Sequence, residues 1–454
     1  MITITSPDPV VVALIGKQKK SQTTYHLSRY VLVTDANTEC LYYHTLTCEL
    51  LVISKSELQL SDTIDKLIAS WFMVPSAFDE FTFVKRIRSM RQLVYRAGIN
   101  NNIVSSVKRY WILTTTYCNA NCFYCHEKGI PKMAMTEDTA DEVIQYIVKN
   151  SPDKEIFLNW YGGEPLFNDK VIDIISSNLL SKGFTFTSSM ISNGLLFSSD
   201  TIEKASSYWN LKQVQITLDG MAETYNRVKG YSSSIALNPF NTVINNISRL
   251  LQSGIAVQIR LNIDSYNKKE LFELTDFLID RFKTYNGFSI YSAPLFEECL
   301  GTTYRRTDDE RKKVYEAHFS LTEKINLNGL LPRTTLPKSI KSEARCIAVS
   351  SARVIFPDGQ LAFCHDYFDG VLSGNIHGKE PTIDEKMSYT ECIAEKPDCS
   401  SCIRYPQCVR LKKCFNNKCN YYEIKDWMYT TKQEMLWTYQ EFQQKEKSTT
   451  RSNV

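Results

Sequence analysis

Residues 110–125 read YWILTTTYCNANCFYC, and the rest of the chain is best understood outward from them. An apolar run typical of a buried strand ends in Cys118, Cys122 and Cys125, spaced C-x3-C-x2-C. Three thiolates can hold three irons of a 4Fe-4S cube and leave the fourth iron without a protein ligand. The alternative is a structural zinc site, for which the neighbouring His126 would supply a fourth ligand.

Strands alternate with amphipathic helices downstream of this stretch. Strands are expected at 110–116, 156–161, 184–191, 214–218, 256–263 and 288–295, and helices with apolar residues at i, i+3, i+4 and i+7 at 136–150 and 238–253. This alternation implies a parallel sheet, closed or open. The three cysteines would then follow the carboxyl end of its first strand, where α/β barrels assemble their active sites.

Short polar motifs stand at the ends of the next strands. They are Tyr161-Gly162-Gly163-Glu164-Pro165, Ser192-Asn193-Gly194, Thr217-Leu218-Asp219-Gly220 and Asn262. Together with the cysteine triplet they resemble the radical S-adenosylmethionine (SAM) superfamily, whose free iron binds the amine and carboxylate of SAM. The resemblance implies fold class α/β, with a partial (β/α)6 barrel over residues 106–335. It also implies a SAM site made by Tyr124, Gly162, Gly163, Glu164, Pro165, Asn193, Thr217, Arg227 and Asn262.

The expected roles follow side-chain chemistry. The two glycines would let the backbone approach the methionine moiety, and Glu164 would accept from its ammonium. Asn193 and Asn262 offer amide hydrogen bonds. Tyr124 resembles the aromatic residue that lies against adenine, with a packed core tyrosine as the alternative. Arg227 falls where many members carry an arginine, although an exposed arginine is an ordinary surface residue.

Eight of the 14 cysteines lie after residue 340, where the hydrophobic periodicity ends. Seven of them resemble the SPASM domain, which holds two auxiliary 4Fe-4S clusters. The resemblance gives the nearer cluster Cys346, Cys364 and Cys414, and the farther one Cys399, Cys402, Cys408 and Cys419. A pair of zinc ribbons is the alternative, because C-x2-C is also a zinc signature.

Two departures from the SPASM pattern leave this ligation open. Five residues separate Cys408 from Cys414, where the family usually has three, so the pairing of Cys414 and Cys419 is not fixed. The nearer cluster has three evident ligands, so it could keep an open iron, use Cys392, or bind a substrate thiolate. An open iron could hold an acceptor thiolate and would favour a thioether product.

The first hundred residues predict a separate α+β domain, with strand-rich runs at 25–34 and 39–53 and a helical region at about 56–96. Its position resembles the winged-helix-like leader-recognition domain of peptide maturases, which pairs an extended peptide with a sheet edge. The expected divisions are 1–105 for this domain, 106–335 for the barrel, 336–427 for the SPASM domain, and 428–454 for a C-terminal helix and tail.

Composition and net charge limit the kinds of partner that the chain is expected to bind. A formal charge of +3 provides no field that would draw the chain to nucleic acid or to an anionic membrane. The apolar run at 9–16 is too short to span a bilayer, and its lysines follow rather than precede it. We therefore expect a cytoplasmic enzyme with no nucleic-acid or membrane partner.

The combined resemblance predicts a radical SAM maturase of a ribosomally made precursor peptide. It would use three 4Fe-4S clusters and SAM, bind the peptide through its leader, and receive electrons from a flavodoxin or ferredoxin. The expected product is a cross-link, either a cysteine thioether to carbon or a carbon-carbon bond. His365 and Asp366, which follow Cys364, are candidate bases, with a solvated surface pair as the alternative.

Other functions remain possible at this point. A sulfatase maturase or a peptide epimerase would share most of these motifs, although sulfatase maturases lack the long N-terminal region and carry an aspartate directly after the cysteine that corresponds to Cys364. A non-catalytic zinc or iron-sulfur protein would leave Gly162 to Pro165 unexplained.

Overall fold

The computed structural model describes residues 1–21, 23–102, 107–231, 238–297, 305–339, 346–349, 352–365, 373–412, 414 and 419–452. Side chains are described for all of these except 95–102, 383 and 449–452. No helix within these ranges is long and apolar enough to cross a membrane.

The N-terminal domain is an α+β unit built on a four-stranded antiparallel sheet in the order β1-β5-β4-β3. Its elements are β1 (Ile2–Thr5), α1 (Pro9–Ile15), β2 (Tyr25–Leu27), β3 (Val31–Ala36), β4 (Glu39–His44), β5 (Glu49–Ser54), α2 (Ser61–Ala69), β6 (Met73–Pro75) and α3 (Glu80–Asn102). The first predicted run splits into β2 and β3, and β6 interrupts the region predicted as helical. The cause is tertiary pairing: β2 and β6 form a small antiparallel sheet of their own.

The central domain is the predicted partial barrel. Its strands are β7 (Arg109–Thr115), β8 (Glu155–Gly162), β9 (Thr185–Ser192), β10 (Leu211–Leu218), β11 (Ala256–Ile263) and β12 (Phe288–Pro294). They are parallel and lie in chain order, so the predicted six-stranded sheet is confirmed. The connecting helices are α4 (Glu137–Asn150), α5 (Asp169–Ser181), α6 (Ser199–Ser207), α7 (Ala222–Lys229), α8 (Pro239–Gln252), α9 (Glu270–Phe282) and α10 (Asp308–Leu327).

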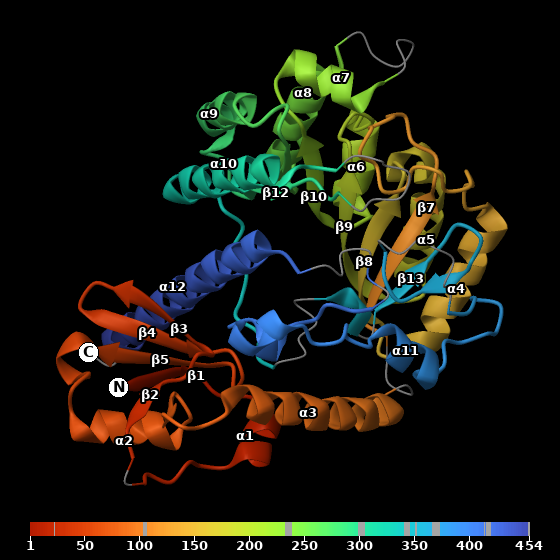
Figure 1. Cartoon of the computed structure of the whole chain (residues 1–454). Coiled ribbons are helices and arrows are strands. Elements are labelled where there is room, and N and C mark those ends of the chain that lie inside the picture. The colour runs from red at the N-terminus through yellow and green to blue at the C-terminus, as the bar shows by residue number, and fades with distance from the viewer. Residues whose placement is uncertain are drawn as a thin grey trace.

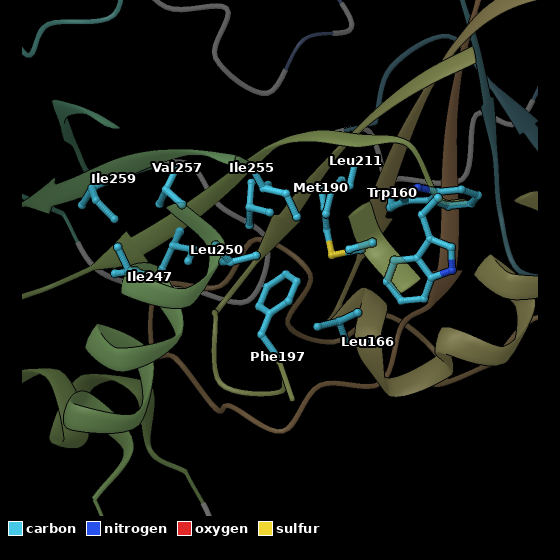
Figure 2. Packing of buried hydrophobic residues seen from close by; sticks show 14 of the residues in the cluster. Trp160, Leu166, Met190, Phe197, Leu211, Ile247, Leu250, Ile255, Val257 and Ile259 are labelled. Carbon is cyan, nitrogen blue, oxygen red and sulfur yellow. The ribbon is translucent and has the colours of Figure 1, made fainter. Parts of the chain in front are cut away.

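The main core lies between this sheet and its helices (Figure 2). Alternate strand residues such as Trp160, Met190 and Val257 meet helix residues such as Ile247 and Leu250, and all five are at most 1% exposed. Burying a side chain of this size stabilises the fold by roughly 1.5–3 kcal/mol relative to leaving it exposed. The opposite face of the same strands is therefore free to line the site.

The cysteine-rich region contributes a hairpin to the barrel sheet. Strands β13 (Arg353–Ile355) and β14 (Leu361–Ala362) are antiparallel to each other, and β13 pairs in parallel with β7. Short 3-10 helices lie at Lys55–Glu57, Pro165–Asn168, Ile347–Val349, Pro397–Ser401 and Tyr405–Gln407, and α11 spans Ile383–Tyr389. The C-terminal region thus extends the sheet beside the strand that precedes the first cysteine triplet.

The last helix, α12 (Tyr421–Ser452), connects the two ends of the molecule (Figure 1). It begins within the span predicted for the SPASM domain, contacts α10 of the barrel, and reaches β1, β3 and β4 of the N-terminal sheet. Met435 and Tyr439 of this helix are buried in the same apolar cluster as Leu32 and Leu41 of the sheet. One face of the N-terminal sheet is therefore completed by the end of the chain.

Candidate active site

The first cysteine triplet lies on the loop that follows β7. The backbone N–H of Ala120 donates to the Cys118 sulfur at 3.4 Å, and the N–H of Cys125 donates to the Cys122 carbonyl at 3.2 Å. Burial raises the pKa of the Cys118 thiol to about 12 and that of Cys125 to about 11. Both are therefore thiols at neutral pH in the free protein, so loading a metal cluster must release protons.

The donor set fits an iron-sulfur cube better than one metal ion. All three cysteines are half-buried, and the neighbouring charges of Cys122 and Cys125 both act on Cys118. Among the described residues, no group of three or more His, Cys, Asp and Glu side chains is arranged around one ion position. A cube takes one thiolate on each of three separate irons, so its ligands need not converge on a point.

Gly162 and Gly163 let the end of β8 lie directly against the start of the cysteine loop. A Cβ atom on Gly162 would stand 2.2 Å from the carbonyl oxygen of Thr115, and one on Gly163 would stand 2.3 Å from that of Tyr117. A backbone hydrogen bond forms at this close approach, because the N–H of Gly163 donates to the carbonyl oxygen of Thr115 at 3.0 Å. The glycines are needed because the end of β8 touches the residues that follow β7. The sequence motif had suggested a different reason, namely backbone approach to the methionine moiety of SAM.

Glu164 is fully buried and ties the ends of β8 and β9 together. One carboxylate oxygen accepts from the Ser192 hydroxyl at 2.9 Å and from the N–H of Leu166 at 3.3 Å, and the other accepts from the N–H of Asn193 at 2.8 Å. Burial raises its pKa to about 7. These three contacts are internal to the protein, and the predicted contact of Glu164 with the ammonium of SAM stays a prediction.

Asp219, at the end of β10, organises a buried polar cluster beside the triplet. It accepts from the Tyr124 hydroxyl at 3.0 Å and from the Asn262 amide at 3.2 Å, and its carboxylate lies 3.1 Å from the ammonium of Lys229. Asp219 is 0% and Lys229 3% exposed. Tyr124 is therefore oriented by Asp219 as well as by its place in the cysteine loop.

Lys229 was missed in the sequence, which pointed to Arg227 two residues earlier. Arg227 is exposed on α7. Lys229 is also tied to the cysteine loop through its backbone, because its carbonyl oxygen accepts from the N–H of Asn121 at 2.7 Å. Burial alone would lower the pKa of Lys229, but Asp219 and Tyr124 raise it above its usual value, so it carries a full charge. Nothing in the local sequence marks this lysine as buried.

The other residues predicted to bind SAM also lie at this edge of the sheet, and they differ in the contacts that they make. The amide of Asn193 donates to the side-chain oxygen of Asn119 at 2.6 Å, within the cysteine loop. Asn262 accepts from Arg260 at 2.9 Å, while Pro165 begins a 3-10 turn and its carbonyl accepts from Thr114. Thr217 is half-buried on β10.

The sheet face opposite the helices holds His365. The imidazole stacks on Trp111 of β7 with ring centroids 4.0 Å apart, and meets Tyr161 of β8 edge-on at 5.0 Å. The Tyr161 hydroxyl hydrogen-bonds the ring of His126, next to Cys125, at 2.8 Å. His365 is thus carried into the barrel by the β13–β14 hairpin. Asp366, the other candidate base, lies outside the described residues.

The C-terminal cysteines form two sets. Four lie against one small apolar cluster, namely Cys346, Cys364, Cys392 and Cys414. The others are coupled through their charges, because Cys399, Cys408 and Cys419 all act on Cys402. This grouping separates Cys414 from Cys419, and the cluster that each of them ligates stays a prediction.

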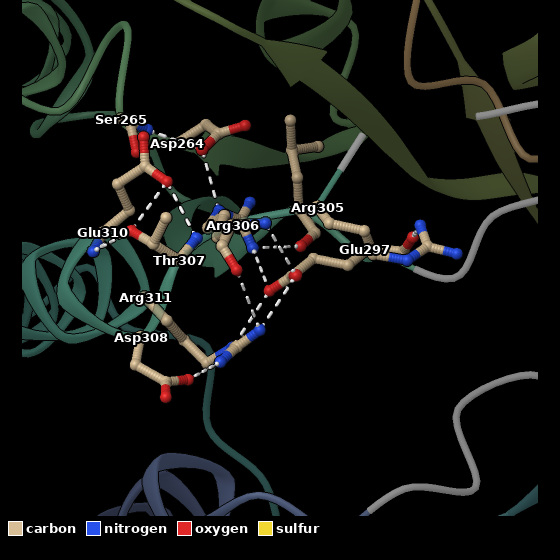
Figure 3. Close-up of polar contacts among 10 residues, drawn as sticks. Asp264, Ser265, Glu297, Arg305, Arg306, Thr307, Asp308, Glu310 and Arg311 are labelled. Atoms are coloured by element: carbon tan, nitrogen blue, oxygen red, sulfur yellow. Dashed lines mark hydrogen bonds and ion pairs between the residues drawn. The ribbon is translucent and has the colours of Figure 1, made fainter. Parts of the chain in front are cut away.

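A cavity of about 740 Å³ lies between the edge strand β12, α10 and the start of α12. Its wall includes Cys419 and a buried ionic network at the start of α10, shown in Figure 3. Arg306 lies 2.8 Å from Asp264 and 3.2 Å from Glu297, and Arg311 lies 3.0 Å from Glu297. Although burial raises the pKa of Glu297, the two arginines hold it below its usual value.

Comparisons with known proteins agree with this geometry. Residues 112–278 match the model of the Radical SAM superfamily. A probable GTP 3',8-cyclase of Saccharolobus islandicus (strain Y.N.15.51 / Yellowstone #2) is 24% identical over 303 residues, covering 63% of this chain and 89% of the relative. One of Methanococcus aeolicus is 29% identical over 129 residues, covering 27% and 42%.

Two solved structures share the fold over most of the chain. The protein anSMEcpe with bound AdoMet has a TM-score of 0.55 at 15% identity, covering 73% of this chain and 96% of its own. Streptococcus suis SuiB bound to S-adenosylmethionine has a TM-score of 0.50 at 13% identity, covering 88% and 99%.

Residues 112–278 are thus a radical SAM domain, and the chain is an enzyme. Such a domain implies a 4Fe-4S cluster and bound SAM. The triplet of Cys118, Cys122 and Cys125 stays the predicted ligand set of that cluster. Within the superfamily its fold is that of anSMEcpe and SuiB, with a cysteine-rich C-terminal region beside the barrel.

Proposed function

We propose that this enzyme modifies a ribosomally made peptide and that it carries two auxiliary 4Fe-4S clusters on its C-terminal cysteines. When bound, SAM on the first cluster supplies a 5'-deoxyadenosyl radical that removes hydrogen from an unactivated carbon. The product is a cross-link within the peptide, either a thioether or a carbon-carbon bond.

One observation carries the proposal. The pairing of β13 with β7 sets Cys364 and His365 beside the inner face of the strand that precedes the first triplet. A substrate on that face lies between the first cysteine group and the nearer auxiliary one. A cluster held by Cys364 and its neighbouring cysteines would supply an electron acceptor on that side of the barrel.

The chain's own residues define the reaction space. Trp111 and Tyr161 cover the β7 and β8 side with aromatic surface that excludes water, while Arg260 and Gln215 make the β10 and β11 side polar. His365 lies on the aromatic β7 and β8 side, where it is the group proposed to take a proton from the substrate. An apolar wall facing a polar one suits a peptide side chain and its backbone.

The N-terminal domain supports a peptide substrate in particular. The outer edges of its sheet are β1 and β3, which each pair with one neighbour in the sheet. An extended leader adds to such an edge through main-chain hydrogen bonds. A structural neighbour, anSMEcpe, has been solved with AdoMet and a Cp18Cys peptide.

The curated relatives suggest a different substrate, a purine nucleotide, because they are probable GTP 3',8-cyclases. The alignment with the first of them covers 63% of this chain, which leaves over a third of it outside the match. GTP is therefore the natural comparison substrate.

The test uses anaerobically reconstituted full-length enzyme with dithionite and SAM. Small open reading frames encoded beside the gene are co-expressed with the enzyme, and the peptides are analysed by mass spectrometry. We expect 5'-deoxyadenosine and a peptide that has lost the mass of two hydrogens. Conversion of GTP, with every peptide unchanged, would contradict the proposal.

The cysteine triplet provides the matched control. Changing Cys118, Cys122 and Cys125 together to alanine must abolish 5'-deoxyadenosine formation while auxiliary iron remains. Changing Cys40, a buried thiol in β4 of the N-terminal domain, must leave product formation intact. A flavodoxin or ferredoxin is the proposed physiological donor in place of dithionite.

A further inference from the structure

Cys392 has no place in the sequence pattern that assigned the other C-terminal cysteines. It follows α11 and lies in a short antiparallel bridge with Leu411. The N–H of Cys414 donates to the carbonyl of that same Leu411 at 3.1 Å. Two cysteines that are distant from Cys346 in the chain are thereby held at one point of the backbone.

Cys392 packs with the nearer set, although it also lines a cavity that Cys399, Cys408 and Cys419 of the farther set reach. With Cys346, Cys364 and Cys414 it packs on the cluster formed by Ala348, Phe363, Tyr389 and Leu411. The farther set is packed elsewhere, since Cys399 and Cys402 lie against the cluster that includes Tyr405 and Trp427. The cysteines whose charges act on Cys402 are Cys399, Cys408 and Cys419, and Cys399 and Cys408 also act on Cys419.

Arg88 of α3 lies where the two sets approach each other. Its guanidinium donates to the carbonyl oxygens of Tyr405 at 2.6 Å and Cys408 at 3.1 Å, and it reaches the Cys392 sulfur at 3.8 Å. It also lies over the Tyr405 ring at 4.3 Å. The Arg88 guanidinium is thereby a hydrogen-bond donor to the Cys392 sulfur and to the backbone of the farther set.

We infer that Cys392 is the fourth ligand of the nearer auxiliary cluster, together with Cys346, Cys364 and Cys414. The inference rests on the proposed function, because it takes the two auxiliary clusters as given. It leaves that cluster without an open iron. A substrate thiolate therefore has no iron to bind there, and a thioether product would have to form without such coordination.

Arg88 has a secondary part in the same arrangement. It belongs to the N-terminal domain, and its hydrogen-bond donor at the Cys392 sulfur is a positioning contact for a cluster in the C-terminal region. Hydrogen bonds to ligating sulfurs raise the reduction potential of a cluster. The reduction potential of the nearer cluster therefore depends on whether the N-terminal domain, which carries Arg88, is docked.

The first experiment is alkylation of the reconstituted full chain with iodoacetamide, with each cysteine analysed by mass spectrometry. Cys392 is half-buried in the free protein, so it reacts when iron is absent. With iron bound we expect Cys392 to be protected together with Cys346, Cys364 and Cys414. Alkylation of Cys392 while those three stay protected overturns this inference alone, whereas alkylation of all eight C-terminal cysteines overturns the proposed function as well.

The second experiment counts iron in the variant that lacks Cys118, Cys122 and Cys125. This background holds about eight irons if both auxiliary clusters form. Adding Cys392→Ala should reduce the content toward about four or give the electron paramagnetic resonance signal of a cluster with one changed iron site. Adding Cys40→Ala is the control and should change neither. An unchanged iron content and spectrum in the Cys392 variant would contradict the ligation.

The role of Arg88 is tested by measuring the midpoint potential of the nearer auxiliary cluster. Arg88→Met in the same background should keep about eight irons and lower the midpoint potential of the nearer cluster. Arg86→Met, which removes an exposed cation from the same helix, should leave that potential unchanged. Equal potentials in the two variants would remove Arg88 from the arrangement and leave the ligation by Cys392 standing.

Discussion

Charged residues buried beside the cysteine triplet carry the greatest stability consequences of any single position. Lys229 and Asp219 are at most 3% exposed and lie 3.1 Å apart, so neither charge can be hydrated if its partner is removed. The loss of one member of a buried pair typically costs about 3–5 kcal/mol, more than the pair itself contributes. Such residues hold the site in place without touching the reacting atoms.

Lys229→Met should lower the free energy of unfolding by about 3–5 kcal/mol, because it leaves Asp219 charged and unpaired. Denaturant titration of the cluster-free protein measures this. Arg227→Met, on the exposed side of the same helix, should stay within about 0.5 kcal/mol of the parent. If the double variant Lys229→Met with Asp219→Leu were no more stable than Lys229→Met alone, buried charge would not be the cause.

His44 makes the N-terminal domain sensitive to acid. Its Nε2 lies 3.0 Å from the Trp71 carbonyl and its Nδ1 accepts from the N–H of Leu46 at 3.2 Å, so the neutral ring fits. Burial lowers its pKa from 6.5 to about 4. Since the unfolded chain binds the proton more readily, this stability is present above pH 6.5 and is lost as the pH falls toward 4.

We expect the Leu46 amide to exchange faster as the pH falls through that window, after correction for the intrinsic rate. The corresponding loss of stability amounts to about 3 kcal/mol from the shift in pKa. His44→Gln, which keeps a donor and an acceptor but does not titrate, should flatten the profile. A parallel decline in both proteins would assign the effect to other groups.

At the scale of elements, the site is made by strand ends that touch. The sequence predicted the six barrel strands closely, because their buried runs are bounded by glycine and polar residues. It could not predict β1 or β6, which depend on pairing with residues about fifty positions away. The sequence also suggested that Gly162 and Gly163 make room for a ligand. It could not show that they make room for contact between β7 and β8, because no sequence pattern indicates such a contact.

Gly163→Ala should disrupt the cysteine loop. Its Cβ would lie 2.3 Å from the carbonyl oxygen of Tyr117 and 2.7 Å from its carbon, both rigid backbone atoms. We expect reduced iron on the triplet, measured in a variant with the auxiliary cysteines removed. Gly329→Ala meets nothing within 4 Å and has only the strain of a positive φ, so it should retain full iron. Full loading of the Gly163 variant would show that the loop can move.

The whole molecule is assembled from segments far apart in the chain. The α/β fold and the cysteine-rich C-terminal region were predictable, because strand alternation and cysteine spacing are local in sequence. The sequence left Cys392 as one of three alternatives for the nearer cluster and could not choose among them, because its packing with Cys346, Cys364 and Cys414 depends on α11 and on the Leu411 bridge. Nor did the sequence indicate that α12 would cover the N-terminal sheet.

Met435→Ala should loosen that cover. The side chain is 0% exposed and packs among Leu32, Leu41 and Tyr43, so truncation should cost about 2–5 kcal/mol. Hydrogen exchange in β3 and β4 should accelerate, while exchange in the barrel strands stays unchanged. Gln444→Ala, at an exposed position of α12, should alter neither. Uniform acceleration across the chain would indicate general unfolding instead.

The packing of α12 on the first sheet also sets a delay during synthesis. Strand β5 ends at Ser54 and α12 begins at Tyr421, so about 370 residues are translated between them. At about 5–20 residues per second a ribosome needs about 20 to 70 seconds for that length. Throughout that interval the part of the N-terminal sheet that Met435 and Tyr439 later cover stays exposed on the nascent domain, which is the period in which a chaperone would protect it.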